Sequence, residues 1–262
     1  MERYTHGHHE SVLRSHRWRT VENSAAYLLP HLKPGLSLLD VGCGPGNITA
    51  DLAQRLAPGR VVGVDSAADI IAAARRDYPD ADFAAGDVYR LQFEDASWDI
   101  VHAHQLLQHV PDPVGALKEM RRVVSRRGIV AARDSDYATF TWHPADERLD
   151  RWLALYHDIA RANGGEPDAG RRLLSWAQQA GFTNVKASAS AWCFATPEDR
   201  HWWGGLWADR MTTSAIATQA IAERRATAEE LSEMAAAWRA WAAAADGWFA
   251  ITHGEIVCSK VD

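Results

Sequence analysis

The stretch LLDVGCGPG, residues 38–46, decides the fold of this chain. An apolar run at 36–41, suited to a buried strand, leads into a turn that holds three glycines. Residues 47–57 follow as a helix with apolar side chains on one face. Glycine permits a tight turn and lets the backbone come close to a ligand, and open α/β sheets bind ligands at the carboxyl ends of their strands. The stretch therefore predicts a strand, a turn and a helix with a ligand site at the turn.

Strands and helices continue to alternate as far as residue 134. Further strands are expected at 61–65, 81–87, 98–104 and 127–133, with helices at 67–76 and 112–125. This alternation is typical of parallel strands joined by right-handed crossovers. It predicts a doubly wound α/β sheet.

The rest of the chain extends this core at both ends. We expect a helix at 10–29 within an N-terminal helical lid over 1–34, which would bring Tyr4 or His8 to the site; a solvated terminus is the alternative. After residue 134 the pattern predicts helices at 146–162 and 169–180, a strand at 184–194, helices in several pieces over 197–245 and a final strand at 247–259. The expected architecture is a mostly parallel sheet of seven strands in one domain at 35–262, with a helical cap inserted at about 197–246 before the last strand.

The composition excludes several classes of function. The chain has 262 residues with 28 Lys+Arg against 34 Asp+Glu, so its net charge of −6 argues against a dedicated nucleic-acid binder. No apolar stretch reaches about 18 residues, and the polar start of the chain lacks the core of a signal peptide, so we expect no membrane span. The three cysteines are far apart and odd in number, which gives no disulfide or zinc pattern and fits the reducing cytoplasm.

Two acidic residues stand where further strands end. Asp65 lies 65 − 46 = 19 residues after the last glycine of the turn, where a carboxylate can accept hydrogen bonds from both hydroxyls of a ribose. The alternative is that Asp65 or Ser66 caps the next helix. Asp87 ends the third strand and can accept from an exocyclic amine, while Val88 beside it can cover an aromatic base.

Taken in order, the segments LDVGCGPG, VGVD, GDV and WDIV resemble those of the class I S-adenosylmethionine-dependent methyltransferases. Within that family the chain looks closest to the branch with the quinone C-methyltransferases of ubiquinone and menaquinone synthesis. The resemblance covers residues 36–134. It implies a Rossmann-like methyltransferase fold, S-adenosyl-L-methionine as the cofactor and no metal.

The resemblance also implies a role for each matching residue. The glycine turn would approach the methionine part of the cofactor, Asp65 would bind the ribose and Asp87 the adenine amine. His104 and Gln105 would lie near the sulfonium and the methionine amino group. The full set of expected cofactor-binding residues is Asp40, Gly42, Gly44, Gly46, Asp65, Ser66, Gly86, Asp87, Val88, His104 and Gln105. At Gln108 relatives often have histidine, which puts any catalytic use of this position in doubt.

Candidates for a catalytic base are His104, Tyr137 and His143. A base is needed only if the acceptor must lose a proton, and histidine suits this task because its pKa lies near neutrality. His102 and His104 alternate along one strand and so share a face, with His104 at the open end. Tyr137 and His143 follow the fifth strand, where this fold usually meets its acceptor.

The acceptor is expected to be a small organic molecule. Ten of the 12 tryptophans lie after residue 140, and although most would serve packing, a few could wall a pocket for a flat ring. Together with the quinone-enzyme resemblance, this favours C-methylation of a quinol, phenol or indole, with N- or O-methylation open. The chain would act as a monomer or homodimer.

Two other functions use the same kind of sheet. An NAD(P)-dependent oxidoreductase would need the spacing Gly-x-Gly-x-x-Gly and a hydride-site signature such as Tyr-x-x-x-Lys, and neither is present. A non-catalytic cofactor-binding regulator remains the other alternative.

Overall fold

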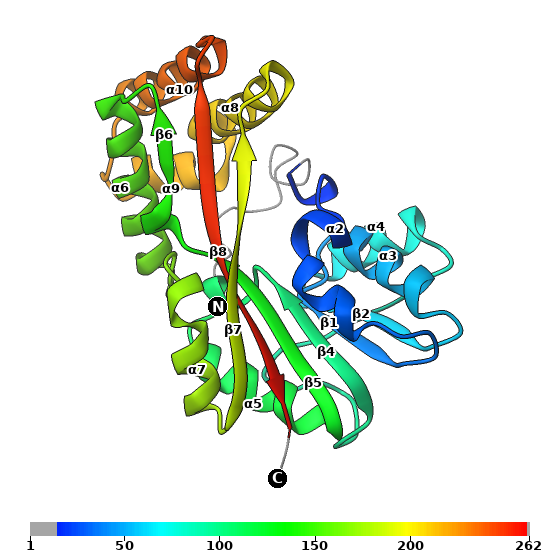
Figure 1. Cartoon of the computed structure of the whole chain (residues 1–262). Helices are drawn as coiled ribbons and strands as arrows, with labels where there is room; N and C mark the ends of the chain where they lie inside the picture. Colours follow the sequence, from blue (N-terminus) through cyan, green and yellow to red (C-terminus); the bar gives the residue numbers. More distant parts are fainter. Residues whose placement is uncertain (1–14, 261–262) are drawn as a thin grey trace. The chain divides into compact units, whose positions relative to one another are not determined.

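Five parallel strands lie side by side in the order β3-β2-β1-β4-β5 in the computed structural model, which describes residues 15–260 (Figure 1). Their bounds are β1 Leu38–Val41, β2 Val61–Asp65, β3 Asp82–Ala85, β4 Trp98–His104 and β5 Val124–Ser135. All five were expected, and β5 begins three residues earlier than predicted, 127 − 124 = 3. Every residue of β1 is buried, as a central strand requires.

Helices cover both faces of these strands. On one face, α3 (Asn47–Leu56) and α2 (Val21–Ser24) bring apolar side chains such as Leu52 against Leu38 and Ile100. On the other face, α5 (Pro113–Val123) and α7 (Leu173–Gln179) pack on the larger cluster that includes Val101 and Val130. The remaining helix, α4 (Ala68–Asp77), packs against Phe83 of β3. The strands are thereby held as the doubly wound sheet that the alternation predicts.

The chain divides into two compact units. Unit 1 comprises 1–15, 136–168 and 191–252, and unit 2 comprises 16–135, 169–190 and 253–262. Two strands belong to both, β7 (Asn184–Phe194) and β8 (Trp248–Ser259). In unit 2, β8 pairs antiparallel with β5, and β7 pairs with β8.

The sheet has eight strands among the described residues, where the sequence predicted seven. The additional strand, β6 (Thr141–His143), pairs with the start of β8 in unit 1. Three residues are too few for an alternating pattern to stand out in a sequence. Unit 1 is also larger than the expected insertion at 197–246, because α6 (Glu147–Ala162) packs with α9 (Ala215–Ala222) and α10 (Ala228–Ala243).

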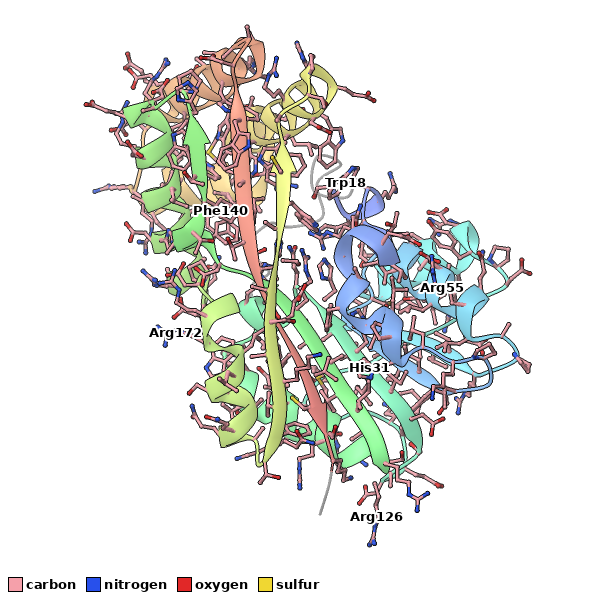
Figure 2. The ribbon with its side chains drawn as sticks, viewed as in Figure 1. Trp18, His31, Arg55, Arg126, Phe140 and Arg172 are labelled. Atoms are coloured by element: carbon pink, nitrogen blue, oxygen red, sulfur yellow. The ribbon has the colours of Figure 1, made fainter. Side chains whose placement is uncertain are left out.

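Tryptophans form the core of unit 1. Trp152 of α6 meets Trp207 of α8 (Pro197–Thr213) edge to face at 4.5 Å and Trp238 of α10 at 4.7 Å. All three are fully buried. Phe140, labelled in Figure 2, stacks on Tyr137 at 4.2 Å in the same aromatic cluster. These rings stabilise the unit by packing on one another, as we expected for most of the tryptophans.

The predicted helix at 10–29 is wrong as a single helix. Residues 10–14 lie outside the described residues, as do Tyr4 and His8 and the first part of the 1–34 lid. Thr20 caps a new helix, α2, by accepting from the N–H of Asn23. A 3-10 helix, η1 (Ala26–His31), then takes over and contains Pro30. The capping side chain of Thr20 divides what the apolar pattern alone suggested was continuous.

Replacing Gly46 by alanine should destabilise unit 2. Gly46 has φ +87°, and an added Cβ would lie 2.6 Å from Phe83 and 3.1 Å from Ala74. The left-handed backbone costs about 1–2 kcal/mol for an L-residue and forced repacking about 1–3 kcal/mol, so we expect the free energy of unfolding in urea to fall by about 2–5 kcal/mol.

Gly205→Ala is the matched control, since Gly205 lies inside α8 with no atom within 4 Å of an added Cβ. It should leave the unfolding free energy unchanged or raise it by up to about 1 kcal/mol. A loss of less than about 1 kcal/mol for Gly46→Ala would contradict the packing argument.

Candidate functional site

The turn between β1 and α3 has a left-handed backbone at three positions. Gly42, Gly44 and Gly46 have φ values of +74°, +54° and +87°. The N–H groups of Gly42 and Cys43 both donate to the carbonyl of Val64, at 2.7 and 3.0 Å, which ties the turn to β2. Only glycine adopts this backbone readily, so the three glycines have a conformational cause.

The three glycines differ in what surrounds them. A Cβ on Gly42 would lie 2.9 Å from Leu106, and one on Gly46 would collide with Phe83. A Cβ on Gly44 would meet no atom closer than His16 Nδ1, at 3.9 Å. Gly42 and Gly46 are therefore required by packing within the protein, whereas among residues 15–260 no atom comes closer than 3.9 Å to a Cβ on Gly44.

Asp65 lies beside this turn and supports it. Its Oδ2 accepts from the N–H of Gly44 at 3.0 Å, and its Oδ1 accepts from the N–H of Ala67 at 3.0 Å. The bond to Ala67 reaches the residue before α4, but the N-cap of this helix is Ala67 itself and has no side-chain cap, so neither Asp65 nor Ser66 is the N-cap residue. Each carboxylate oxygen can accept about two hydrogen bonds, so Asp65 keeps capacity for the hydroxyls of a ribose. Ser66, the next residue, is exposed.

Residues 86–88, the third expected segment, lie directly after β3, the strand beside β2. The N–H of Gly86 donates to the carbonyl of Asp65 at 3.0 Å, which joins the ends of β2 and β3. Asp87 is exposed, and its Oδ1 accepts from the N–H of Tyr89 at 2.9 Å. Val88 is half-buried against the core. The structure thus brings the glycine turn, Asp65 and the 86–88 segment to one edge of unit 2.

Asp40 has a different environment from the other expected cofactor ligands. It is buried, its Oδ2 accepts from the Thr49 hydroxyl at 2.6 Å, and its Oδ1 lies 2.8 Å from Nδ1 of His102. Both oxygens are thus engaged behind the turn. Asp40 links β1 to α3 and β4, so its geometry fits a positioning role better than direct contact with a ligand.

Gln105 follows β4 with an unusual backbone. Its φ is +52°, which is rare for a residue with a side chain. Its Oε1 accepts from Arg19 Nη2 at 2.5 Å, and its Nε2 lies 2.8 Å from Ser135 Oγ and 3.0 Å from His253 Nε2. Strained backbone that surrounding contacts hold in place is often found at functional sites.

A row of buried polar side chains crosses the carboxyl ends of β4 and β5 and the middle of β8. His104 is paired with Arg133, Arg133 with Glu255, and Ser135 with His253, and paired residues project from the same face. All five are buried. We call these five residues the polar row. An apolar sheet interior does not need them, so they indicate a site.

Burial controls the charges in the polar row. It lowers the pKa of His104 well below the usual range, with Arg19 and Arg133 acting in the same direction, so His104 is neutral at physiological pH. Burial also lowers the pKa of Arg133 to about 10, while Glu255 opposes this shift. Glu255 accepts hydrogen bonds from Ser188 at 2.8 Å and Ser190 at 2.5 Å. Arg133 therefore remains a cation beside a carboxylate.

Two candidate bases have surroundings that do not suit catalysis. Tyr137 is buried in unit 1, where its ring lies between Phe140 and Tyr156, the latter stacked at 4.0 Å. His143 is an exposed residue of β6 and pairs with the equally exposed Asp246 at 3.1 Å. The first serves packing and the second lies on the surface, so His104 is the candidate that the structure favours.

Sequence reasoning missed part of the polar row. Arg133, Glu255 and His253 were not singled out, although polar residues at alternate positions of otherwise apolar strands were a visible signal. Arg19 had no such signal, because its contact with Gln105 joins residues far apart in the chain.

The residues present fit S-adenosylmethionine. The described residues leave space beside Gly44, Asp65 keeps capacity for hydroxyl donors, and Asp87 presents an exposed carboxylate one strand further along. These three features suit the methionine part, the ribose and the adenine amine in that order.

Comparisons with known proteins also indicate a methyltransferase. A family model described as a methyltransferase domain matches residues 39–132. An uncharacterized methyltransferase of Schizosaccharomyces pombe is 33% identical over 273 residues, which cover 98% of this chain and 96% of that protein. A probable methyltransferase of Aspergillus luteorubrus is 28% identical over 279 residues, covering 98% and 97%.

A solved structure shows the same fold. It is phosphoethanolamine N-methyltransferase 2 of Haemonchus contortus in complex with phosphomonomethylethanolamine and S-adenosylhomocysteine. The TM-score is 0.56 at 17% identity, over 92% of this chain and 53% of that one. Because the relative from Schizosaccharomyces pombe matches along nearly its whole length, and the sheet and the glycine turn are those of the fold, this chain belongs to the class I S-adenosylmethionine-dependent methyltransferases.

Proposed function

We propose that this S-adenosylmethionine-dependent methyltransferase acts on a small organic acceptor held at the polar row. The observation that carries the proposal is the burial of the polar row. Its residues on β4 and β5 lie at the carboxyl ends of the two strands that come after β1 in the sheet order, and the glycine turn directly follows β1. Ligands of open α/β sheets bind at the carboxyl ends of the strands, which is where His104 and Gln105 lie. The affinity of the Asp65→Ala variant for S-adenosylhomocysteine tests the proposed cofactor site.

The cofactor would be held by the edge formed by β1, β2 and β3. Gly44 would offer its backbone to the methionine part, Asp65 would accept from the ribose and Asp87 from the adenine amine, with Val88 covering the ring. Gly42 and Gly46 would shape the turn, Gly86 would join the strand ends, and Asp40 would position α3. The bound cofactor supplies a methyl group on a positively charged sulfur, which leaves by in-line displacement.

The chain's own residues would orient the acceptor and keep water out. Orientation of this kind can lower a barrier by about 7–11 kcal/mol. His104 is neutral and can accept a hydrogen bond or a proton, but its lowered pKa makes it a weak base. It is therefore better suited to orienting a hydroxyl or amine than to deprotonating one with a high pKa. Tyr137 and His143 have no part in the proposed site.

The aromatic nature of the acceptor stays a proposal that rests on the likeness to the quinone C-methyltransferases. Trp152, Trp207 and Trp238 give it no support, because they pack on one another, as we expected for most of the tryptophans. C-methylation of a quinol, phenol or indole is the first reaction to test, and N- or O-methylation are the alternatives. An oxidoreductase is set aside, since the relatives over the full chain are methyltransferases.

Several further expectations stay proposals. None of the helices between residues 15 and 260 is long and apolar enough to cross a bilayer. The three cysteines are free thiols, which supports a reducing cytoplasm as the compartment. The acidic net charge argues against nucleic acid as the acceptor. A monomer or a homodimer would serve the proposed chemistry equally well.

Asp65→Ala should weaken binding of S-adenosylhomocysteine. Hydrogen bonds to a charged acceptor contribute about 1.5–3 kcal/mol, so we expect the Kd from calorimetric titration to rise about 10- to 100-fold. Asp80→Ala, at an exposed residue between α4 and β3, is the control and should change the Kd by less than about threefold. Equal Kd values for Asp65→Ala and the wild type would remove Asp65 from the cofactor site.

Asp134→Asn should make stability less dependent on pH. Asp134 is fully buried at the end of β5; its Oδ1 accepts from the N–H of Gln108 at 3.0 Å. Burial raises the pKa of this carboxyl to about 7. Because the folded protein then keeps a proton that the unfolded chain releases, stability falls as pH rises from about 4 to about 7. Asparagine removes this loss, so the variant should gain stability over the wild type across that range, by at most about 4 kcal/mol.

Thermal unfolding at about pH 4.5 and about pH 8 measures the effect of Asp134→Asn. The exposed control Asp80→Asn should differ from the wild type by the same amount at both pH values. A constant offset for Asp134→Asn as well would show that this carboxyl titrates normally in the folded protein.

A further inference from the structure

Ser135, the last residue of β5, is held in the polar row by two glutamine side chains. It is 3% exposed. Its backbone N–H donates to Oε1 of Gln108 at 3.1 Å, and its Oγ accepts from Nε2 of Gln105 at 2.8 Å. Gln108 is itself buried. The place of the Ser135 hydroxyl is therefore fixed through both the backbone and the side chain.

The amide of Gln105 can take only one of its two orientations. Its Oε1 lies 2.5 Å from Nη2 of Arg19, and a guanidinium group only donates hydrogen bonds. The amide oxygen must therefore face Arg19, which leaves both hydrogens of Nε2 for other partners. One of them goes to Ser135 Oγ, and the other goes to Nε2 of His253 at 3.0 Å. Nε2 of His253 then accepts and carries no hydrogen.

This orientation decides what the Ser135 hydroxyl can do. Because Oγ already accepts from Gln105, the hydrogen of the hydroxyl points away from the amide. Between residues 15 and 260, Oγ donates to no other group. A buried donor without an acceptor is costly, so a ligand that offers an oxygen lone pair at this place would remove the cost.

The hydroxyl lies where the acceptor is expected. β4, β5 and β8 are neighbours in the sheet (Figure 1), and Ser135 projects from the same face as the rest of the polar row. It is at the carboxyl end of β5, and open α/β sheets bind their ligands at such ends. Ser135 is therefore in a position to contact the molecule that receives the methyl group.

The ionisable groups of the polar row favour an oxygen over a protonated amine. Glu255 already accepts from the hydroxyls of Ser188 and Ser190. Burial lowers the pKa of His104 well below its usual range, so this side chain is neutral and supplies no negative charge. A neutral or anionic oxygen beside the Ser135 hydroxyl therefore suits these surroundings better than an ammonium group.

We propose that the Ser135 hydroxyl donates a hydrogen bond to an oxygen of the acceptor. The inference rests on the proposed function and narrows its acceptor, because a phenol or a quinol presents such an oxygen and indole has only an N–H donor. Gln105 is then a positioning residue, since its amide sets the direction of the Ser135 hydrogen. Ser135 would let the site choose between rings of equal size.

The test compares two ring compounds of the same shape, 1-naphthol and 1-naphthylamine. The naphthol oxygen accepts a hydrogen bond, whereas the lone pair of the arylamine is delocalised into its ring. Each compound is titrated calorimetrically into the protein saturated with S-adenosylhomocysteine. The wild type should bind 1-naphthol at least about threefold more tightly than 1-naphthylamine. Ser135→Ala should raise the Kd of 1-naphthol about 3- to 10-fold and that of 1-naphthylamine less than about twofold.

Two further variants separate the hydroxyl from its surroundings. Ser135→Thr keeps a hydroxyl and should keep the preference for 1-naphthol. Gln105→Glu keeps the length of the side chain, but its carboxylate only accepts hydrogen bonds. Ser135 would then donate to this carboxylate, so the preference for 1-naphthol should be lost. A preference that persists in Gln105→Glu would contradict the positioning role of Gln105.

Ser125→Ala is the matched control, because Ser125 lies at the other end of β5 and is half-buried. It should leave both Kd values unchanged within about twofold. Thermal unfolding of each variant verifies that it folds.

Three outcomes would overturn the inference while leaving the proposed function in place. If Ser135→Ala weakens both compounds equally, Ser135 only shapes the site. If it weakens neither, or if the wild type shows no preference, the hydroxyl does not meet the acceptor oxygen. A wild type that binds S-adenosylhomocysteine but neither ring compound is a different result; it would contradict the aromatic acceptor of the proposed function and the inference with it.

Discussion

The left-handed backbone of the turn after β1 is the constraint on which the site depends. Two consecutive N–H groups of this turn, from Gly42 and Cys43, donate to one carbonyl of β2, and the next glycine donates to Asp65. The turn is therefore fixed by the neighbouring strand before any ligand arrives. A preformed site of this kind loses little conformational entropy on binding. The same contacts determine where α3 begins and hence where Asn47 can hold the segment before α2.

A second constraint is the burial of ionisable groups within an otherwise apolar sheet. Asp40 of β1 lies 2.8 Å from His102 of β4, and Arg133 of β5 pairs with Glu255 in the middle of β8. Removing charged groups from water is costly, and such pairs rarely stabilise a fold more than apolar residues would. The N–H of the strained Gln105 donates to the carbonyl of Arg133, which indicates that the protein gives up some stability at this end of β5 in exchange for a defined arrangement of donors and acceptors.

Much of the fold could be predicted from local patterns in the sequence. The five parallel strands and α3, α4 and α5 were expected within a few residues, because each has a strong period and a clear turn at its end. The two failures have local causes. Thr20 interrupts an apolar pattern that was taken as one helix, and β6 is too short to show a pattern. The site was predictable where its residues are close in sequence, as at 42–46 and 86–88. The site could not be predicted where side chains from distant segments meet, as for Arg19 and Gln105 or for Arg133 and Glu255.

The position of β8 affects how the chain can fold. β8 is the last strand along the sequence, yet it lies between β5 and β6 and is also the partner of β7. During synthesis, the edges of β5, β6 and β7 that pair with β8 remain unpaired until β8 leaves the ribosome. Unpaired edges of this kind are sites of aggregation, and contacts between distant residues slow folding. The segment 186–190 of β7 holds one lysine, two serines and two alanines, a composition of low hydrophobicity that reduces the tendency of this unpaired edge to associate with other chains.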